Sequence, residues 1–296
     1  MPAHKTKRRL LRMLAALLLF VLAMGFLVRF MQVRLAFLSG MLLLGISLLM
    51  PLRDEEEPWD LLWDTAGWIA SLFIGLILGT YFRDPVVRFI RSFDSIAEYH
   101  RRLLEMPDWV LLLIFLLLMD FLCYWAHRAL HSDKLWSQHA WHHSPRYLNW
   151  LSGTRTTFVN YLILTITPAI VVGILYPMPR AREAVMIILA VPRLADHLHH
   201  TNMWLPWARY LEYLIVTPRF HFVHHHRERR FNDSNFGFLF SFWDRLFGTY
   251  SDPETLEPNF PLGLNYDNEN WRLLLGLGPV RDRDKMQPIA ERESVD

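Results

Sequence analysis

The sequence predicts an all-α protein, a multi-pass membrane helical bundle that carries a cytoplasmic histidine-rich helical cap. Three observations lead to this fold class. The 296 residues are 52% hydrophobic, and the apolar residues gather in runs of about twenty, the length at which a helix crosses a bilayer. Short charged stretches separate these runs. Twelve of the 14 histidines lie between His127 and His226, in segments that follow apolar runs.

An N-terminal transmembrane hairpin is predicted for the first domain, residues 1–58. Its two apolar runs cover residues 10–28 and 35–50, and five lysines and arginines lie within the first twelve residues. A basic start before an apolar run is also typical of a secretory signal. The run is long, however, and no small-residue cleavage site follows it. A spanning helix that starts in the cytoplasm therefore explains the pattern better.

Four further apolar runs lie in the second predicted domain, residues 59–280. The runs at 59–82, 107–125 and 158–176 have the length of membrane spans. The run at 184–198 is short and ends in histidines, so we expect it to enter the bilayer only partly.

The charged segments lead to separate predictions. Residues 83–106 alternate arginines with apolar residues, which indicates an amphipathic helix on the membrane surface, although an ordinary charged loop is nearly as compatible. Asp60 and Asp64 are expected at the membrane surface. Residues 199–250 are aromatic and basic without a spanning run, and they should form the cap. The third predicted domain, residues 281–296, is a polar flexible tail.

Counting spans from a cytoplasmic N-terminus places the histidine clusters and both termini on the cytoplasmic side. The arginines of residues 83–106 would then lie on the outer side, against the positive-inside tendency. The net charge of +2, without a basic face interleaved with aromatics, predicts no nucleic-acid partner. Cys123 is the only cysteine, which excludes an internal disulfide and a cysteine-ligated metal cluster.

The spacing of the histidines is that of metal ligands. His127 and His131 are four residues apart, so a helix would place both on one face. The pattern His-x-x-His-His occurs at 139–143 and again at 221–225, and on a helix its first histidine shares a face with either of the other two. Neutral imidazoles suit iron, copper, nickel and zinc, and so many ligands exceed the needs of one ion. The pattern therefore predicts two metals close together, in preference to a histidine-based pH sensor.

In this order, the motifs resemble those of the sterol desaturase / fatty acid hydroxylase superfamily of membrane non-haem di-iron enzymes. The resemblance covers about residues 120–250 and is greatest to bacterial members related to alkylglycerol monooxygenases and C-5 sterol desaturases. It rests on the segments DFLCYWAHRALH, HAWHHS, HTN, TPRFHFVHH, NFG and WDRLFGTY. One departure is that relatives often carry a further histidine shortly after the second motif, whereas residues 149–158 contain none.

The resemblance implies that nine histidines hold two iron ions, with O2 as co-substrate and with no catalytic residue separate from the metal ligands. These are His127, His131, His139, His142, His143, His200, His221, His224 and His225. His197, His199 and His226 are candidates for additional ligands or for supporting groups. Asp120 and Asp196 are expected to orient ligands by accepting the second N–H of an imidazole.

The resemblance further implies an O2-dependent enzyme that hydroxylates or desaturates an unactivated C–H position of a sterol, fatty acyl or ether-lipid substrate. The expected location is a bacterial inner membrane. The sequence contains no GxGxxG motif opening a βαβ unit, no cysteine set for an iron–sulfur cluster and no cytochrome b5-like segment. Electrons should therefore come from a ferredoxin, a cytochrome b5-like protein or a reductase, docked near 227–230. A histidine-rich zinc transporter and a non-catalytic lipid-binding relative are the alternative functions.

Overall fold

The computed structural model describes residues 31–53, 60–175, 191, 194–257, 259–266 and 269–278. These residues are mostly helical and contain no β-strand, only two isolated antiparallel bridges, which confirms the predicted helical class. The apolar run at 10–28, most of the run at 184–198 and the predicted tail lie outside the described residues.

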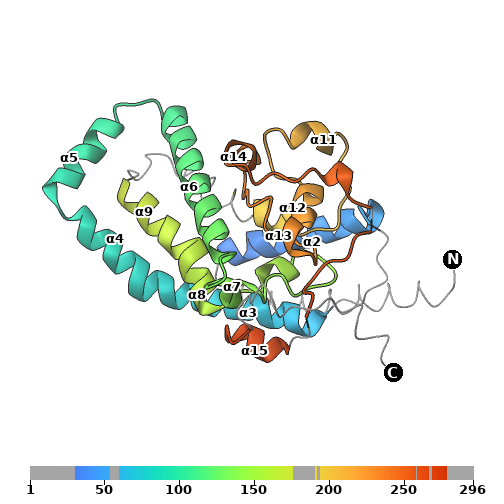
Figure 1. Cartoon of the computed structure of the whole chain (residues 1–296). Coiled ribbons are helices and arrows are strands. Elements are labelled where there is room, and N and C mark those ends of the chain that lie inside the picture. Colours follow the sequence, from blue (N-terminus) through green and yellow to red (C-terminus); the bar gives the residue numbers. More distant parts are fainter. Residues whose placement is uncertain are drawn as a thin grey trace, which may run out of the picture.

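Most of the long helices occupy the left and lower parts of the molecule in Figure 1, and one crosses its middle toward the right. The first is α2 (Met31–Leu49), after which α3 (Leu61–Leu78), a π-helical turn (Gly79–Arg83) and α4 (Asp84–Arg91) form one continuous helix. Then come α5 (Asp94–Leu103) and α6 (Asp108–Leu130). The next long helix consists of α8 (Phe158–Tyr161), a π-helical turn (Leu162–Ile166) and α9 (Thr167–Leu175).

Short helices joined by loops make up most of the remaining structure, including the upper right part of Figure 1. They are α7 (Trp136–His139), α11 (Ala208–Leu211), α12 (Pro218–His224), α13 (Arg229–Asn232), α14 (Phe242–Leu246) and α15 (Asn270–Leu274), with 3-10 turns at Ser152–Thr154 and Pro253–Thr255. Residues 199–250 consist of such short elements, and a cytoplasmic cap formed by this segment stays a prediction.

Among the described residues, two helices have the length and hydropathy of membrane spans, Leu61–Arg91 and Asp108–Leu130. Shorter apolar helices cover Leu38–Leu49 and Phe158–Val171. All four coincide with apolar runs of the sequence. How many of them cross a bilayer, and in which direction, stays a prediction.

Residues 84–91 and 94–103 are helical, as the amphipathic pattern of that segment predicts, while a position on the membrane surface stays a prediction. They form α4 and α5, and neither helix has a buried residue. Salt bridges between Glu98 and both Arg101 and Arg102 are solvent-exposed and lie one helical turn apart. An ordinary charged loop is therefore excluded for this segment.

Asp64 corrects the expectation that both acidic residues at the start of α3 lie at the surface. Asp60 is exposed, but Asp64 is only 1% exposed. Its carboxylate accepts hydrogen bonds from Arg155 Nε at 2.7 Å and from Asn149 Nδ2 at 3.1 Å. Arg155 is itself 2% exposed, and its guanidinium also donates to Ser144 Oγ at 2.8 Å. A buried charge is tolerated because this ion pair and its hydrogen bonds compensate the lost hydration.

The α2 helix packs directly on the rest of the protein. Leu44 joins Trp68, Trp150 and Leu151 in one buried apolar cluster. Just beyond the helix, the main chain of Arg53 exchanges two hydrogen bonds of 3.0 Å with the side chain of Asn202. The predicted boundary near residue 58 thus separates two segments that share a core.

Local sequence explains where the histidine-bearing helices begin. Pro107 precedes α6, and Asp108 lies in its first turn, where a negative charge favours the helix dipole. Thr217 caps α12, since its hydroxyl accepts the N–H of Phe220 at 3.2 Å, and Pro218 occupies the first helical turn. The α6 helix is followed directly by His131 and α12 ends at His224, so the C-terminal ends of both helices deliver imidazoles to the site.

Candidate metal centre

All nine histidines that the resemblance implies as ligands come together in two adjoining buried groups. Group A consists of His127, His131, His139, His143 and His224, and group B of His142, His200, His221 and His225. Within each group the ligand nitrogens lie within 4.8 Å of one another. The groups are in contact, because the rings of His143 and His225 stack with centroids 4.4 Å apart.

Helical geometry explains how the histidines are distributed between the groups. Histidines four residues apart always belong to the same group: His127 with His131, His139 with His143, and His221 with His225. The middle histidine of each His-x-x-His-His pattern belongs to the other group. These are His142 in group B and His224 in group A. Consecutive residues of a helix point about 100° apart, so each pattern supplies ligands to both groups.

The two patterns differ in local structure. In the downstream pattern, α12 contains His221 and His224, and His225 ends the helix. In the upstream pattern, α7 ends at His139, and hydrogen-bonded turns continue through His143. The downstream pattern is thus helical up to His224, whereas in the upstream pattern the helix ends at the first histidine.

The outer nitrogens of several imidazoles are held by main-chain oxygens. His127 Nδ1 donates to the carbonyl of Phe236 at 3.0 Å, His200 Nδ1 to that of Asp196 at 2.7 Å, and His224 Nδ1 to that of Ser234 at 2.8 Å. Because a carbonyl oxygen only accepts, each Nδ1 carries the proton and each Nε2 keeps a lone pair. In these three histidines the lone pair is therefore available to a metal ion.

Side chains hold two further outer nitrogens of group A. His139 Nδ1 lies 2.7 Å from Asn160 Oδ1, and His131 Nδ1 lies 3.2 Å from Asp233 Oδ1. Asp233 in turn accepts a hydrogen bond from Arg229 Nε at 2.8 Å. These contacts give the rings fixed orientations, which is the usual task of residues behind metal ligands.

The inner nitrogens of several imidazoles face one another at close distances. The Nε2 atoms of His127 and His139 are 3.1 Å apart, and His200 Nε2 lies 3.2 Å from that of His142 and 3.0 Å from that of His221. Since the outer nitrogens of His127 and His139 face oxygen acceptors, two lone pairs meet across the first contact. A bound cation removes this repulsion.

Several buried nitrogens also lack a hydrogen-bond partner. They are both nitrogens of His143 and of His225, together with His221 Nδ1 and His224 Nε2. Buried polar atoms are normally satisfied, so unpartnered nitrogens in both groups call for a ligand. The described donor set is all-imidazole, which suits iron, copper, nickel or zinc and not magnesium or calcium. The residues therefore fit transition-metal ions.

Burial keeps these imidazoles neutral. It holds the pKa of His142, His143, His221, His224 and His225 well below the ordinary 6.5, and neighbouring histidines lower it further. Neutral imidazole is the form that coordinates a metal. The site thus holds its ligands in the binding form at physiological pH.

Apolar side chains close group A. The ring of Phe236 packs against those of His127, His131 and His224, with centroids 5.8, 5.0 and 5.6 Å apart. Trp136 packs against His131 and other group A imidazoles from α7. Both aromatic residues are buried, so they shield the imidazoles from water.

The three additional histidine candidates lie outside both groups. His197 Nδ1 lies 3.1 Å from Ser39 Oγ of α2, and the ring packs on Trp150. His199 packs beside His221, with ring centroids 5.6 Å apart. His226 Nδ1 accepts the N–H of Glu228 at 2.8 Å. Their contacts fit supporting positions around the groups.

The two aspartates behave differently from the expectation. Asp120 orients no imidazole, because its carboxylate accepts the N–H groups of Leu239 at 2.5 Å and Phe240 at 3.0 Å and Trp243 Nε1 at 2.8 Å. It ties the segment 239–243 to the middle of α6. Asp196 does contact His200 Nδ1, but through its main-chain oxygen at 2.7 Å; its carboxylate is 3.5 Å away.

Residues 149–158, which lack the further histidine that relatives often carry, contact group B through Gly153. A Cβ added to Gly153 would lie 2.5 Å from Cγ and Nδ1 of His200, so only glycine leaves room for that ring. The main chain of Arg155 hydrogen-bonds His142. The buried Arg155–Asp64 ion pair anchors this segment to α3. Sequence reasoning did not predict that Gly153, Arg155 and Asp64 support the site. The one local signal is that Gly153 and Arg155 lie in a segment that follows a histidine motif.

Together, the fold and the site define a class: helical proteins with a buried, all-imidazole cluster suited to transition-metal ions. Residues 112–249 match the family model for fatty acid hydroxylase. The matched residues make up slightly less than half of the chain and contain all nine histidines, so this part of the chain is similar to the fatty acid hydroxylase family.

Several curated relatives are lipid-modifying enzymes by name. The chain is 28% identical over 199 residues to an alkylglycerol monooxygenase of Caenorhabditis elegans, covering 61% of this chain and 37% of the relative. It is 29% identical to that of Xenopus tropicalis, covering 59% and 39%. It is 31% identical to an ornithine lipid hydroxylase of Rhizobium tropici, covering 47% and 41%. The aligned part spans less than half of each relative. No solved structure matches the chain significantly.

Proposed function

We propose that this protein is an O2-dependent di-iron enzyme of the membrane that hydroxylates or desaturates an unactivated C–H position of a lipid. The observation that carries the proposal is the pair of adjoining all-imidazole groups with inward-facing nitrogens. The relatives named alkylglycerol monooxygenase and ornithine lipid hydroxylase support a lipid substrate, such as a sterol, a fatty acyl chain or an ether lipid.

The residues of groups A and B would each hold one iron ion. With O2 and electrons from a donor, two iron ions supply the oxidising power to remove hydrogen from an unactivated C–H bond. The protein's own task is then positioning and shielding. The helix ends and turns fix the imidazoles, Asn160, Asp233 and three carbonyls hold their outer N–H groups, and Phe236 and Trp136 exclude water.

Electrons should arrive from a separate protein, a ferredoxin, a cytochrome b5-like protein or a reductase. The basic segment 227–230 is the proposed docking surface. Arg230 is largely exposed, and Arg229 is paired with Asp133 and Asp233, the residue that also contacts His131. Turnover by the purified protein with NAD(P)H alone would contradict the need for a donor protein.

Two measurements test the function. Lipid analysis of membranes with and without the protein should reveal one lipid class that gains a hydroxyl group or a double bond. Metal analysis of the purified protein separates the enzyme from the zinc-transporter alternative. Tightly held iron, close to two ions per chain, supports the enzyme, whereas exchangeable zinc supports transport. An unchanged lipid profile despite bound iron would favour a non-catalytic lipid-binding relative.

A further inference from the structure

The segment 204–214 of the cap exposes an unusual number of large apolar side chains. They are Trp204 (49% exposed), Trp207 (75%), Tyr210 (70%), Leu211 (39%), Tyr213 (66%) and Leu214 (58%). We call this segment with these side chains the aromatic surface. Contiguous exposed apolar patches on folded proteins usually mark a contact with another apolar phase or partner. Tryptophan and tyrosine are the residues enriched where a protein meets the bilayer interface.

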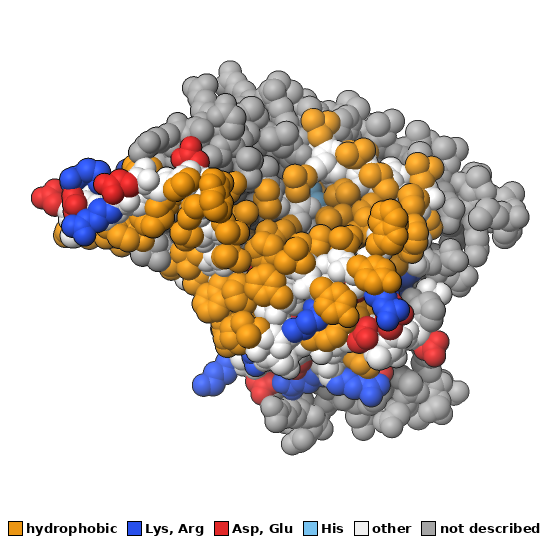
Figure 2. All heavy atoms as spheres, turned by 90° about the horizontal axis from the view of Figure 1, so that it is seen from above, with side chains coloured by type: hydrophobic (Ala, Val, Ile, Leu, Met, Phe, Trp, Pro, Cys, Tyr) orange, Lys and Arg blue, Asp and Glu red, His pale blue; other side chains and the backbone are white. Residues whose placement is uncertain are grey.

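The aromatic surface is continuous with α6, the most apolar candidate span. Trp125 of α6 packs on Phe247, which directly follows α14, with ring centroids 5.0 Å apart. Arg245 of α14 lies over the ring of Tyr213, 5.0 Å from its centroid. Seen from above, hydrophobic side chains gather across the face that carries α6, α14 and α11 (Figure 2). A bilayer around α6 would therefore meet this part of the cap.

The other end of the aromatic surface adjoins the apolar helix α2. The N–H of Trp204 donates to the carbonyl of Met50, just after α2, at 2.8 Å. Leu49 and Met50 are 83% and 41% exposed there. The surface thus links the ends of two apolar helices that are distant in sequence.

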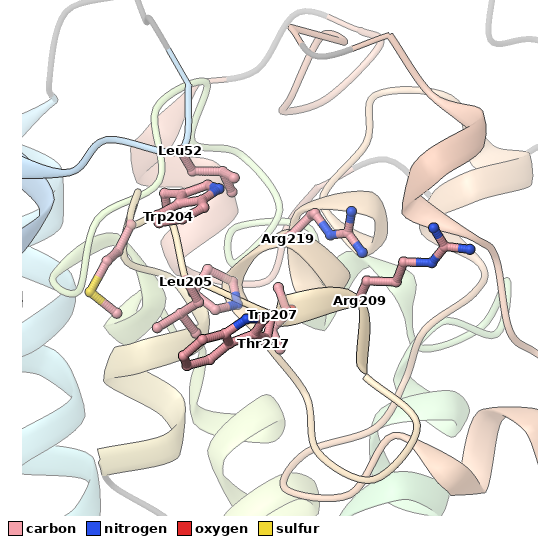
Figure 3. A pocket seen from close by; sticks show the side chains of 10 residues that line it. Leu52, Trp204, Leu205, Trp207, Arg209, Thr217 and Arg219 are labelled. Carbon is pink, nitrogen blue, oxygen red and sulfur yellow. The ribbon is translucent and has the colours of Figure 1, made fainter. Parts of the chain in front are cut away.

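Apolar and basic groups are segregated around the aromatic surface. A cavity of about 190 Å³ lies at its edge, lined by Trp204, Trp207, Leu205 and Arg209 among others. Figure 3 shows the two indoles with the leucines on one side and the guanidinium groups of Arg209 and Arg219 on the other. This division between apolar and basic sides is typical of segments that lie at the level of lipid headgroups.

The two arginines differ in their partners. Arg219 donates to Glu212 Oε2 at 2.7 Å and also pairs with Glu254, so its charge is compensated within the protein. Arg209 is exposed and makes no hydrogen bond or ion pair with any described residue. Its charge is therefore available to an anionic group outside the protein, such as a lipid phosphate.

Trp207 has a strained backbone conformation at the start of α11, where its carbonyl accepts the N–H groups of Tyr210 at 2.9 Å and Leu211 at 3.2 Å. Trp207 has φ 59° and ψ 18°, in the left-handed region that a bulky residue rarely adopts. The indole is nevertheless 75% exposed, so packing within the described residues does not compensate this cost. Burial of the indole in a lipid interface would compensate it.

We propose that the aromatic surface inserts into the headgroup region of the phospholipid bilayer, with Arg209 placed at the phosphates. The cap then lies partly in the membrane surface, and the segment connects His200 to His221 of group B. A lipid chain would reach group B from the bilayer without crossing water. This inference rests on the proposed function for its membrane setting and deepens it by assigning the lipid-facing side of the cap.

Depth measurements with spin labels test the proposal. In a Cys123→Ala background, Trp207→Cys and Tyr210→Cys are labelled with a nitroxide, and the full chain is placed in nanodiscs of phosphatidylcholine and phosphatidylglycerol. Arg230→Cys is the control, since its side chain is 72% exposed on a different part of the cap. Collisions with apolar O2 and with water-soluble nickel-EDTA-diacetate are compared by power saturation.

The proposal expects positions 207 and 210 to collide more with O2 than with the nickel complex, and position 230 to do the reverse. Arg209→Glu should shift the label at 210 toward water in these anionic nanodiscs. The proposal would be overturned if positions 207 and 210 were as accessible to the nickel complex as position 230. Iron content, measured on the same samples, reports separately on the proposed function, so failure of one is distinguishable from failure of the other.

Discussion

Gly153 offers the sharpest test of the ligand arrangement in group B. In Gly153→Ala, the new Cβ would lie 2.5 Å from Cγ and Nδ1 of His200 and 3.0 Å from its Cβ. Nonbonded carbon atoms prefer about 3.5–4.0 Å, so the imidazole or the segment must move by about 1 Å. His200 Nε2 is only 3.0 and 3.2 Å from two other imidazole nitrogens, and its Nδ1 is held at 2.7 Å by a carbonyl. The ring has little room to yield without leaving the group.

The expected size of the effect follows from the cost of overpacking. Inserting a methyl group into a packed site costs about 1–3 kcal/mol. If that cost falls on the metal-bound state, binding in group B weakens roughly 5- to 150-fold. Group A does not contact Gly153 and should keep its ion.

Metal affinity is measured by competition with a chelator, together with iron per chain. Gly45→Ala is the matched control, since its added Cβ has nothing within 4 Å. Wild-type affinity in Gly153→Ala, or an equal loss in Gly45→Ala, would refute the reasoning.

Three further predictions address the ligands, their support and their protonation. His142→Ala should abolish activity and release the group B ion, while His226→Ala, outside both groups, should keep both ions; retained activity in His142→Ala would refute its role as a ligand. Asp64→Asn leaves the buried Arg155 guanidinium without its anion, so it should lower the free energy of unfolding by about 3–5 kcal/mol. The control Asp84→Asn removes only an exposed pair with Arg83 and should cost about 0–1 kcal/mol. Equal melting temperatures for the two variants would contradict this account. Because burial lowers the pKa of His142, His143, His221 and His225 below 6.5, folding favours their neutral form, and the stabilisation is present above pH 6.5 and is lost as the pH falls below it. Stability of the metal-free protein should then decline below that pH by up to about 1.4 kcal/mol per pH unit for each histidine, and a melting temperature independent of pH from 7.5 to 5 would argue against it.

The sequence predicts which histidines come together because that signal is local. Histidines four residues apart share a helix face, and the structure places each such pair in one group. The sequence does not predict that His142 and His143 belong to different groups. Spacing alone allows His139 to pair with either, and only the turns after α7 decide between them.

Residues that act through distant partners could not be predicted. From the sequence, Asp64 is predicted to lie at the membrane interface. Its burial depends on the cation of Arg155, which lies far along the chain. Asp120 precedes a histidine motif on the same helix, yet its carboxylate serves the loop at Leu239 and Phe240. Burial and tertiary hydrogen bonds decide both cases, and neither leaves a pattern in the local sequence.

The central claim is that nine histidines in two adjoining groups hold two iron ions. Iron quantitation with Mössbauer spectroscopy of protein grown on ⁵⁷Fe tests it most directly. We expect close to two iron ions per chain in wild-type protein, and about one when His143→Ala removes a group A ligand. Protein from iron-replete cells that holds zinc, or a single iron ion that His143→Ala leaves unchanged, would contradict the account.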